Sequence, residues 1–126
     1  MRLPLATRYA DYDSKGHVNN AVYLTYFEMA RHAAWVERME GDADFPFIVA
    51  EATVRYVSEA MIGQPLDIEV TTAEVRTKAW VWTYVIRDSR DDRVVAEGRT
   101  VQVMYDYDQH RTVPIPEGMR GRLARV

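Results

Sequence analysis

The sequence predicts a single α+β domain, on the basis of its length and of one change in hydrophobic periodicity. At 126 residues, the chain has the length of one domain, so residues 1–126 are treated as one unit. Apolar residues recur at helical spacing between residues 20 and 39, and after residue 46 the period changes from 3.6 to 2. One helix followed by alternating strands favours a helix packed on an antiparallel sheet.

The first forty residues contain the predicted helix and the loop that leads into it. Residues 2–10 are compatible with a first strand. Residues 11–20 are rich in Asp, Asn, Ser and Gly, which favour turns because their side chains bond to nearby backbone groups. Asn19 or Asn20 is therefore a candidate N-cap for the helix over 20–39. The first half of this helix is apolar almost all round, which predicts that it is covered on most sides.

Four alternating runs after the helix predict the strands of the sheet. They occupy residues 46–57, 66–75, 79–87 and 94–105, joined by short turns as an antiparallel meander. The third run is apolar on both faces around Trp80 and Trp82. One helix cannot cover both faces of such a strand. We therefore expect a symmetric partner to cover the second face, which makes the protein at least a dimer.

The composition excludes several classes of site and partner. The absence of cysteine excludes disulfides, thiolate metal sites and cysteine nucleophiles. The formal net charge of -3 argues against a nucleic-acid partner, since such proteins normally have a basic footprint. No stretch approaches the roughly 20 apolar residues of a membrane span, and the first residues lack the apolar run of a signal peptide. We therefore expect a soluble cytoplasmic protein with no membrane partner.

The segment from Arg8 to Arg31 contains the chemically informative residues. It places two carboxylates, Asp11 and Asp13, together with a histidine and two asparagines at the start of the predicted helix. A helix N-terminus has free N–H groups and the positive end of the helix dipole, so it can stabilise negative charge on a carbonyl oxygen. A nearby carboxylate could attack the carbonyl carbon or activate a water molecule. The local chemistry therefore indicates attack on an acyl group.

The same segment also resembles a family signature. The pattern is Asp13-x-x-Gly16-His17-Val18-Asn19-Asn20-x-x-Tyr23-x-x-Tyr26-x-Glu28-x-Ala30-Arg31. It is similar to the signature of the 4-hydroxybenzoyl-CoA thioesterase-like branch of the hotdog superfamily, and the order of the later strands is similar too. The resemblance implies a hotdog fold, in which an antiparallel sheet wraps one long central helix. It also implies hydrolysis of an acyl-CoA thioester without a metal or organic cofactor, in a homodimer or homotetramer with sites at the subunit interface.

The resemblance and the local chemistry together give expected roles for seven residues of the motif. Asp13, the second aspartate of the Asp-x-Asp pair, is the implied catalytic nucleophile or general base. The backbone N–H near Asn20 is the implied oxyanion donor, although many relatives carry another polar side chain at this position. His17 and Asn20 are expected to position water or substrate. The implied substrate-binding residues are Gly16, Asn19, Tyr23 and Tyr26.

Three other functions stay open on the sequence alone. The His-Val-Asn-Asn variant also resembles the motif of acyl-ACP thioesterases, although the acidic balance argues mildly against an acidic carrier protein as partner. A non-catalytic acyl-CoA-binding module would retain the same fold. A hotdog-fold enoyl hydratase would use the spacing between Asp13 and His17, but the Asn-Asn and Tyr-x-x-Tyr pairs fit the thioesterases better.

Several of these residues also have a purely structural interpretation. We expect Asp11 to be structural or solvated, and Tyr23 and Tyr26 to belong mainly to the core. His17 could orient a catalytic group or simply complete the loop. A basic run near the C-terminus could bind the phosphates of coenzyme A, but a solvated tail is the favoured interpretation. That run consists of Arg120, Arg122 and Arg125.

Overall fold

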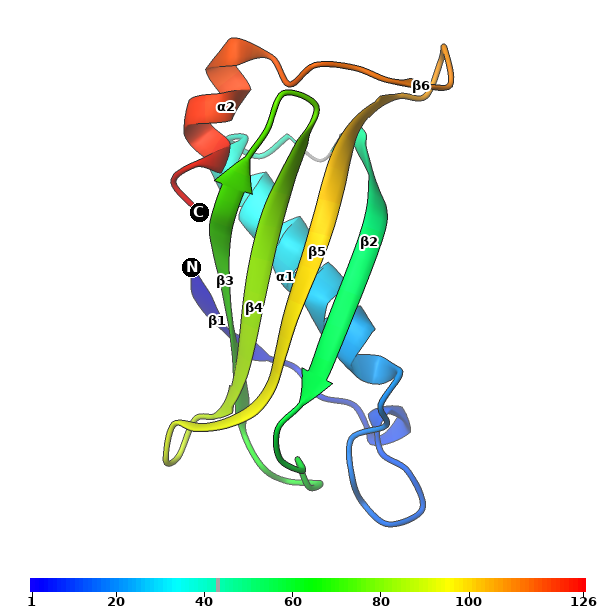
Figure 1. Ribbon diagram of the computed structural model, residues 1–126. Helices are drawn as coiled ribbons and strands as arrows, with labels where there is room; N and C mark the ends of the chain where they lie inside the picture. The colour runs from blue at the N-terminus through cyan, green and yellow to red at the C-terminus, as the bar shows by residue number, and fades with distance from the viewer. Residues whose placement is uncertain (43) are drawn as a thin grey trace.

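An antiparallel sheet with one long helix across its face dominates the computed structural model, which describes residues 1–42 and 44–126 (Figure 1). The strands are β1 (Arg2–Leu5), β2 (Phe47–Tyr56), β3 (Leu66–Val75), β4 (Ala79–Asp88), β5 (Arg93–Asp106) and β6 (Arg111–Thr112). The helices are α1 (Val22–Arg38) and α2 (Glu117–Leu123), with a 3-10 turn, η1, at Tyr9–Asp11. The predicted α+β architecture with an antiparallel sheet is confirmed.

The predicted bounds are close for α1 and for β2 to β5, but they differ at the two ends of the chain. The strand expected over residues 2–10 stops at Leu5. Leu5 pairs with Leu66, the first residue of β3, so β3 offers no partner to the residues after Leu5. The C-terminal segment, expected to be a solvated tail, forms α2 after Pro116. Proline at such a position has the fixed φ that a helix start requires.

The strand order is β1-β3-β4-β5-β2, with β6 beside the end of β5. Strands β3, β4 and β5 form the predicted meander, but β2 pairs with β5 and not with β3. The prediction of one continuous meander is therefore wrong at its first connection. Residues 57–65 do not form a hairpin turn; they cross the end of the sheet from the edge at β2 to the opposite side at β3 (Figure 1).

The core lies between α1 and the inner face of the sheet. Phe27 of α1 is fully buried and stacks on Tyr84 of β4, with ring centroids 4.5 Å apart. The same ring lies directly over Gly98 of β5, where an added Cβ would stand 2.1 Å from Phe27 Cε2. A glycine is therefore required at this crossing, because any side chain would displace the helix or the aromatic ring.

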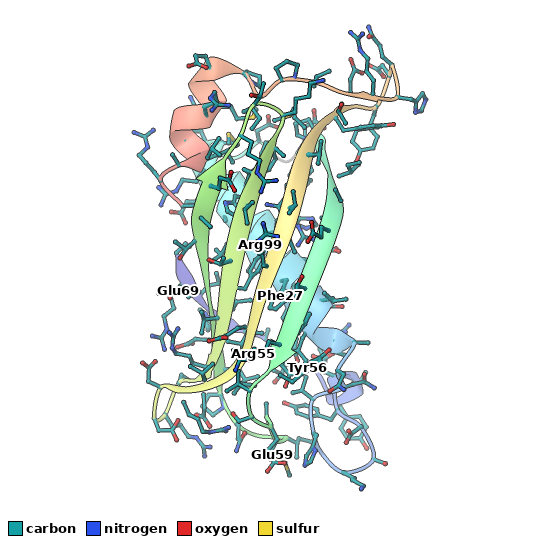
Figure 2. The ribbon with its side chains drawn as sticks, in the orientation of Figure 1. Phe27, Arg55, Tyr56, Glu59, Glu69 and Arg99 are labelled. Carbon is teal, nitrogen blue, oxygen red and sulfur yellow. The ribbon has the colours of Figure 1, made fainter. Side chains whose placement is uncertain are left out.

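Trp80 and Trp82 belong to this core, which corrects the expectation that they leave a face uncovered. Both are fully buried within the single chain, and Trp80 stacks on Trp35 of α1 with centroids 5.9 Å apart. The opposite face of the sheet carries charged side chains, among them Arg55 and Arg99 (Figure 2). The argument for a partner subunit from these tryptophans is therefore wrong, and any subunit contact must rest on another surface.

Candidate active site

The loop between η1 and α1 closes on itself around Asp13. The Asp13 N–H donates to the His17 carbonyl at 2.8 Å, and the Gly16 N–H donates to the Asp13 carbonyl at 3.0 Å. The Asp13 Oδ1 accepts the N–H groups of Lys15 at 2.9 Å and of His17 at 3.1 Å. Gly16 has a φ of 76°, a left-handed conformation that glycine adopts without steric cost. The loop therefore fixes both the backbone and the carboxylate of Asp13.

The electrostatics of Asp13 favour its charged form. The N–H of Lys15, followed by that of His17, holds the pKa of this carboxyl group below its usual value. Asp13 is therefore ionised at neutral pH. Its Oδ1 makes both of these hydrogen bonds, and within the described residues Oδ2 accepts none. One oxygen of an exposed carboxylate is thus free to act on another molecule.

Asp11 lies two residues earlier in a different environment. It is 1% exposed, and its carboxylate accepts hydrogen bonds from the Arg8 side chain at 2.9 Å and from the Tyr26 hydroxyl at 2.9 Å. Burial raises its pKa, but the hydrogen bonds from the Arg8 backbone and Tyr26 outweigh burial, so the net shift is downward. Asp11 therefore ties η1 to α1.

The start of α1 leaves the Asn20 N–H available as a backbone donor. The helix begins at Val22, two residues later than predicted, and Asn19 supports it: its side-chain oxygen accepts the Ala21 N–H at 3.0 Å and its carbonyl accepts the Val22 N–H at 3.0 Å. The Asn20 carbonyl accepts the Tyr56 hydroxyl at 2.8 Å. Within the described part of the chain, the Asn20 N–H donates to no other group. It can therefore donate to a bound oxygen.

A pocket of about 180 Å³ lies where this loop, α1 and the end of β2 meet. It brings together four of the predicted site residues: Asp13, His17, Asn20 and Tyr23. The remaining lining residues are Val18, Tyr56, Val57, Ser58, Glu59 and Ala60. The pocket therefore has one wall from the predicted motif and a second wall from the segment after β2, at the end of the molecule where Tyr56 and Glu59 lie (Figure 2).

The other predicted site residues lie outside this pocket. Gly16 lines a neighbouring hollow of about 380 Å³, which shares Asp13 with the first pocket. Asn19 supports the helix start, as described above. Tyr26 is 1% exposed, and its hydroxyl is bonded to Asp11. These three residues therefore support the loop outside the pocket. Of the predicted site residues, the other four line the pocket itself.

Glu59 also lines this pocket, although no sequence pattern pointed to it. Its Oε2 lies 3.2 Å from Nε2 of His17, across the pocket from the motif. The two segments are also joined by the backbone, since the Val18 N–H donates to the Ala60 carbonyl at 2.9 Å. Glu59 follows β2 in a stretch with no recognised motif, so only the three-dimensional fold places it beside His17.

The sequence pattern of the thioesterase-like superfamily matches residues 7–123 of the chain. The chain belongs to this superfamily. The match covers both walls of the pocket. Membership of the superfamily supports thioester hydrolysis as the general activity.

Solved structures of thioesterases have the same fold. A thioesterase from Thermus thermophilus, complexed with coenzyme A and zinc, is 29% identical, with a TM-score of 0.82 over 97% of this chain and 90% of that one. A predicted thioesterase from Bacillus stearothermophilus is 25% identical, with a TM-score of 0.88 over 97% and 92%. A 1,4-dihydroxy-2-naphthoyl-CoA thioesterase from Synechocystis, at 16% identity and a TM-score of 0.84 over 97% and 93%, shows the fold alone. No curated protein matches the chain significantly.

The C-terminal arginines of this thioesterase-like chain lie far from the pocket. Helix α2 is at the opposite end of the sheet from the loop that carries Asp13 (Figure 1). There Arg120 donates to the Arg76 carbonyl, and Arg122 lies 3.5 Å from Glu40. These contacts do not place the arginines where they could reach a ligand held at the pocket of the same chain.

Two further kinds of feature are absent from the described residues. Across residues 1–42 and 44–126, no three His, Asp or Glu side chains gather in a group that could hold a metal ion. In the same residues no helix has the length and apolar character needed to cross a membrane.

Proposed function

We propose that the protein hydrolyses an acyl-CoA thioester to the free acid and coenzyme A, with Asp13 as the catalytic carboxylate. One observation carries the proposal: the ionised Asp13, the His17 side chain and Asn20 line a single pocket. A carboxylate beside a free backbone N–H at a helix start provides both an attacking group and a stabiliser of the oxyanion. Membership of the superfamily and the relative bound to coenzyme A support this activity and this thiol carrier.

The proposed reaction begins with the thioester carbonyl oxygen at the Asn20 N–H. Asp13 then acts in one of two ways. As a nucleophile, its free oxygen attacks the carbonyl carbon, the C–S bond breaks, and coenzyme A leaves as thiolate before water hydrolyses the resulting mixed anhydride. As a general base, Asp13 takes a proton from a water molecule that attacks the same carbon, and the C–S bond then breaks to release coenzyme A as thiolate and the free acid. A single turnover quenched with acid separates the two routes, because only the first leaves an acyl group on the protein.

The proposal includes a second subunit, in keeping with the hotdog fold implied by the resemblance, with α1 as its central helix. Among the described residues, strand β2 pairs with β5 alone, so its outer edge has unpaired backbone groups in the isolated chain. Its last residue, Tyr56, and the following Val57 line the pocket and are about half exposed. A second copy that pairs along this edge would border the pocket. We therefore propose a homodimer or homotetramer in which each site is completed by its neighbour.

Acyl carrier protein is the competing thiol carrier. The pocket rim carries the carboxylates of Asp13 and Glu59, which disfavour the docking of an acidic protein more than the entry of a thin pantetheine chain. The test is free-thiol release from a panel of acyl-CoA substrates and from the same acyl groups on a carrier protein. A higher kcat/KM with coenzyme A esters is expected. Preference for the carrier protein would replace this proposal with the acyl-ACP activity, and no release from any thioester would favour a binding module.

A further inference from the structure

A buried carboxylate anchors a polar network beneath the second wall of the pocket. Asp88, at the end of β4, is 0% exposed, and its carboxylate accepts the Arg90 side chain at 2.7 and 3.0 Å. Arg93 lies 3.8 Å from the same carboxylate. The hydrogen bonds from Arg90 lower the pKa of Asp88 to about 2. Asp88 thus connects the turn between β4 and β5, through Arg90, to the start of β5, through Arg93.

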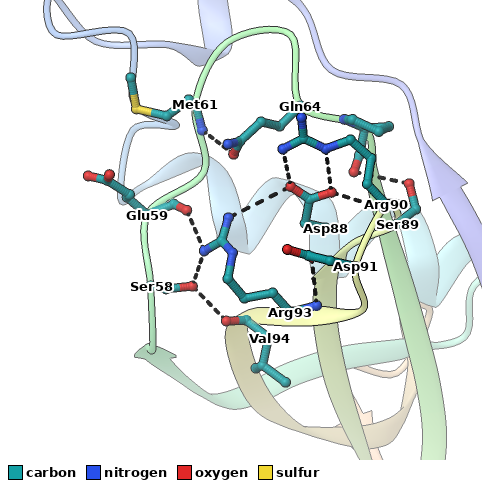
Figure 3. A network of polar contacts seen from close by, with 11 residues as sticks. Ser58, Glu59, Met61, Gln64, Asp88, Ser89, Arg90, Asp91, Arg93 and Val94 are labelled. Carbon is teal, nitrogen blue, oxygen red and sulfur yellow. Dashed lines mark hydrogen bonds and ion pairs between the residues drawn. The ribbon is translucent and has the colours of Figure 1, made fainter.

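The second arginine of this network extends away from Asp88 toward the pocket wall. Arg93 Nη1 donates to the Ser58 hydroxyl and to the Glu59 carbonyl, the latter at 3.0 Å (Figure 3). The Ser58 hydroxyl in turn donates to the Val94 carbonyl at 2.6 Å. Arg93 therefore ties the segment that carries Glu59 to the start of β5. Arg90 binds the same aspartate, but none of its side-chain hydrogen bonds or ion pairs within the described residues reaches this segment.

On its other side the segment contacts the loop that carries Asp13. The Ala60 carbonyl accepts the Val18 N–H at 2.9 Å, and the Ile62 N–H donates to the Gly16 carbonyl at 2.8 Å. Between these bonds, the Glu59 carboxylate lies 3.2 Å from His17 Nε2. Residues 58–62 thus lie between Arg93 and the motif loop, so a shift at Ser58 would move Glu59 and the His17 ring with it.

We infer that Arg93 is a positioning residue of the candidate active site: it holds the Ser58 side chain and the Glu59 carbonyl so that Glu59 orients the His17 ring beside Asp13. This inference rests on the proposed function. Arg93 does not line the pocket, and its hydrogen bonds connect it to the site through the segment it binds. Its guanidinium group reaches Asp88, Ser58 and the Glu59 carbonyl together, which a lysine ammonium on a flexible chain cannot reproduce fully.

The kinetic test compares Arg93→Ala with Arg90→Ala as a matched control, since both remove an arginine bound to Asp88. We expect kcat for Arg93→Ala to fall by about 10–100-fold, with a smaller change in KM, because catalytic groups displaced by an ångström lose activity on this scale. Arg90→Ala should lower the melting temperature at least as much, yet keep kcat within about twofold of wild type. Arg93→Lys should have intermediate kcat, and it replaces Arg93→Ala if that variant does not fold. Equal loss of kcat in the Arg90 and Arg93 variants would overturn the inference.

A second readout does not depend on turnover. The imidazole NMR signals of His17 should shift in Arg93→Ala and in Glu59→Gln, and stay in place in Arg90→Ala. If the wild-type protein hydrolyses no thioester but these shifts are found, the proposed function fails while the positioning by Arg93 stands. If the wild type is active and the His17 signals of folded Arg93→Ala match those of wild type, the positioning role is refuted and the proposed function stands.

Discussion

Replacing Asp13 by asparagine separates its chemistry from its structural part in the loop. The side-chain oxygen of the introduced asparagine can still accept the N–H groups of Lys15 and His17, which the Asp13 Oδ1 accepts at 2.9 and 3.1 Å. What disappears is the negative charge and the free basic oxygen. We expect kcat to fall by about 10²–10⁴-fold, the range for loss of a general base, and further if Asp13 is a nucleophile. The measurement is thiol release under saturating acyl-CoA.

The structure offers a matched control at the other end of the sheet. Asp106 Oδ1 also accepts two backbone N–H groups, from Asp108 at 2.9 Å and Gln109 at 3.0 Å, but lies outside the pocket. Asp106→Asn should keep full activity, and both variants should melt within about 3 °C of wild type. Asp11→Asn is a poorer control, because Asp11 is buried in its own hydrogen-bond network. An Asp13→Asn protein with near wild-type turnover would refute the mechanism.

The pH dependence of the wild-type rate follows from the same contacts. The N–H groups of Lys15 and His17 lower the pKa of Asp13. Its charged form therefore persists at pH values below about 3.9, the pKa of an ordinary aspartate. Under the proposed mechanism the charged form is the active one, so protonation of Asp13 should not lower kcat/KM until the pH falls below about 4. A protonation step of Asp13 near pH 6 would contradict this assignment.

Three further outcomes are expected. Gly98→Ala should destabilise the fold by about 1–3 kcal/mol in urea titration, because the new Cβ would stand 2.1 Å from a Phe27 ring atom; unchanged stability would contradict the close contact. The pKa of Asp88 is lowered to about 2, so its contribution to stability is complete above its ordinary pKa of about 3.9 and is lost as pH falls toward 2. Thermal melts of Asp88→Asn should therefore lose part of the wild-type dependence on pH in this window. Light scattering at micromolar concentration should give at least a dimer, and a stable monomer would remove the proposed shared site.

The elements that sequence reasoning located correctly are those with a local signal. The long helix α1 follows from apolar spacing, and β3 is predicted at its observed bounds because Leu66, Ile68 and Val70 alternate strictly. The pairing of β2 with β5 has no such signal, since it depends on contacts between distant parts of the chain. The burial of Trp80 under α1 could not be predicted either. Alternation shows that a residue faces one side of a strand, but it does not show which side α1 covers.

The residues of the candidate site also differ in whether a local sequence pattern could locate them. Asp13, His17, Asn20 and Tyr23 lie within one short segment, so the sequence motif alone groups them, and all four line the same pocket. Glu59 and Arg93 come from two other places in the chain. Glu59 becomes a neighbour of the motif, and Arg93 a neighbour of Glu59, because residues 57–65 cross the end of the sheet, a path that follows from the strand order. A glutamate that follows a predicted strand does not by itself indicate that its carboxylate lies next to His17.

The crossing of residues 57–65 also bears on the order in which the protein folds. Strands β3, β4 and β5 pair through short hairpins, whereas β2 joins β5 across a large sequence separation, with Phe47 opposite Met104. Local pairings form faster than those that must close a long loop. The second wall of the pocket extends from β2, so it is completed only when this late strand docks. The candidate active site is thus expected to become ordered only when β2 docks on β5, after the pairing of β3, β4 and β5.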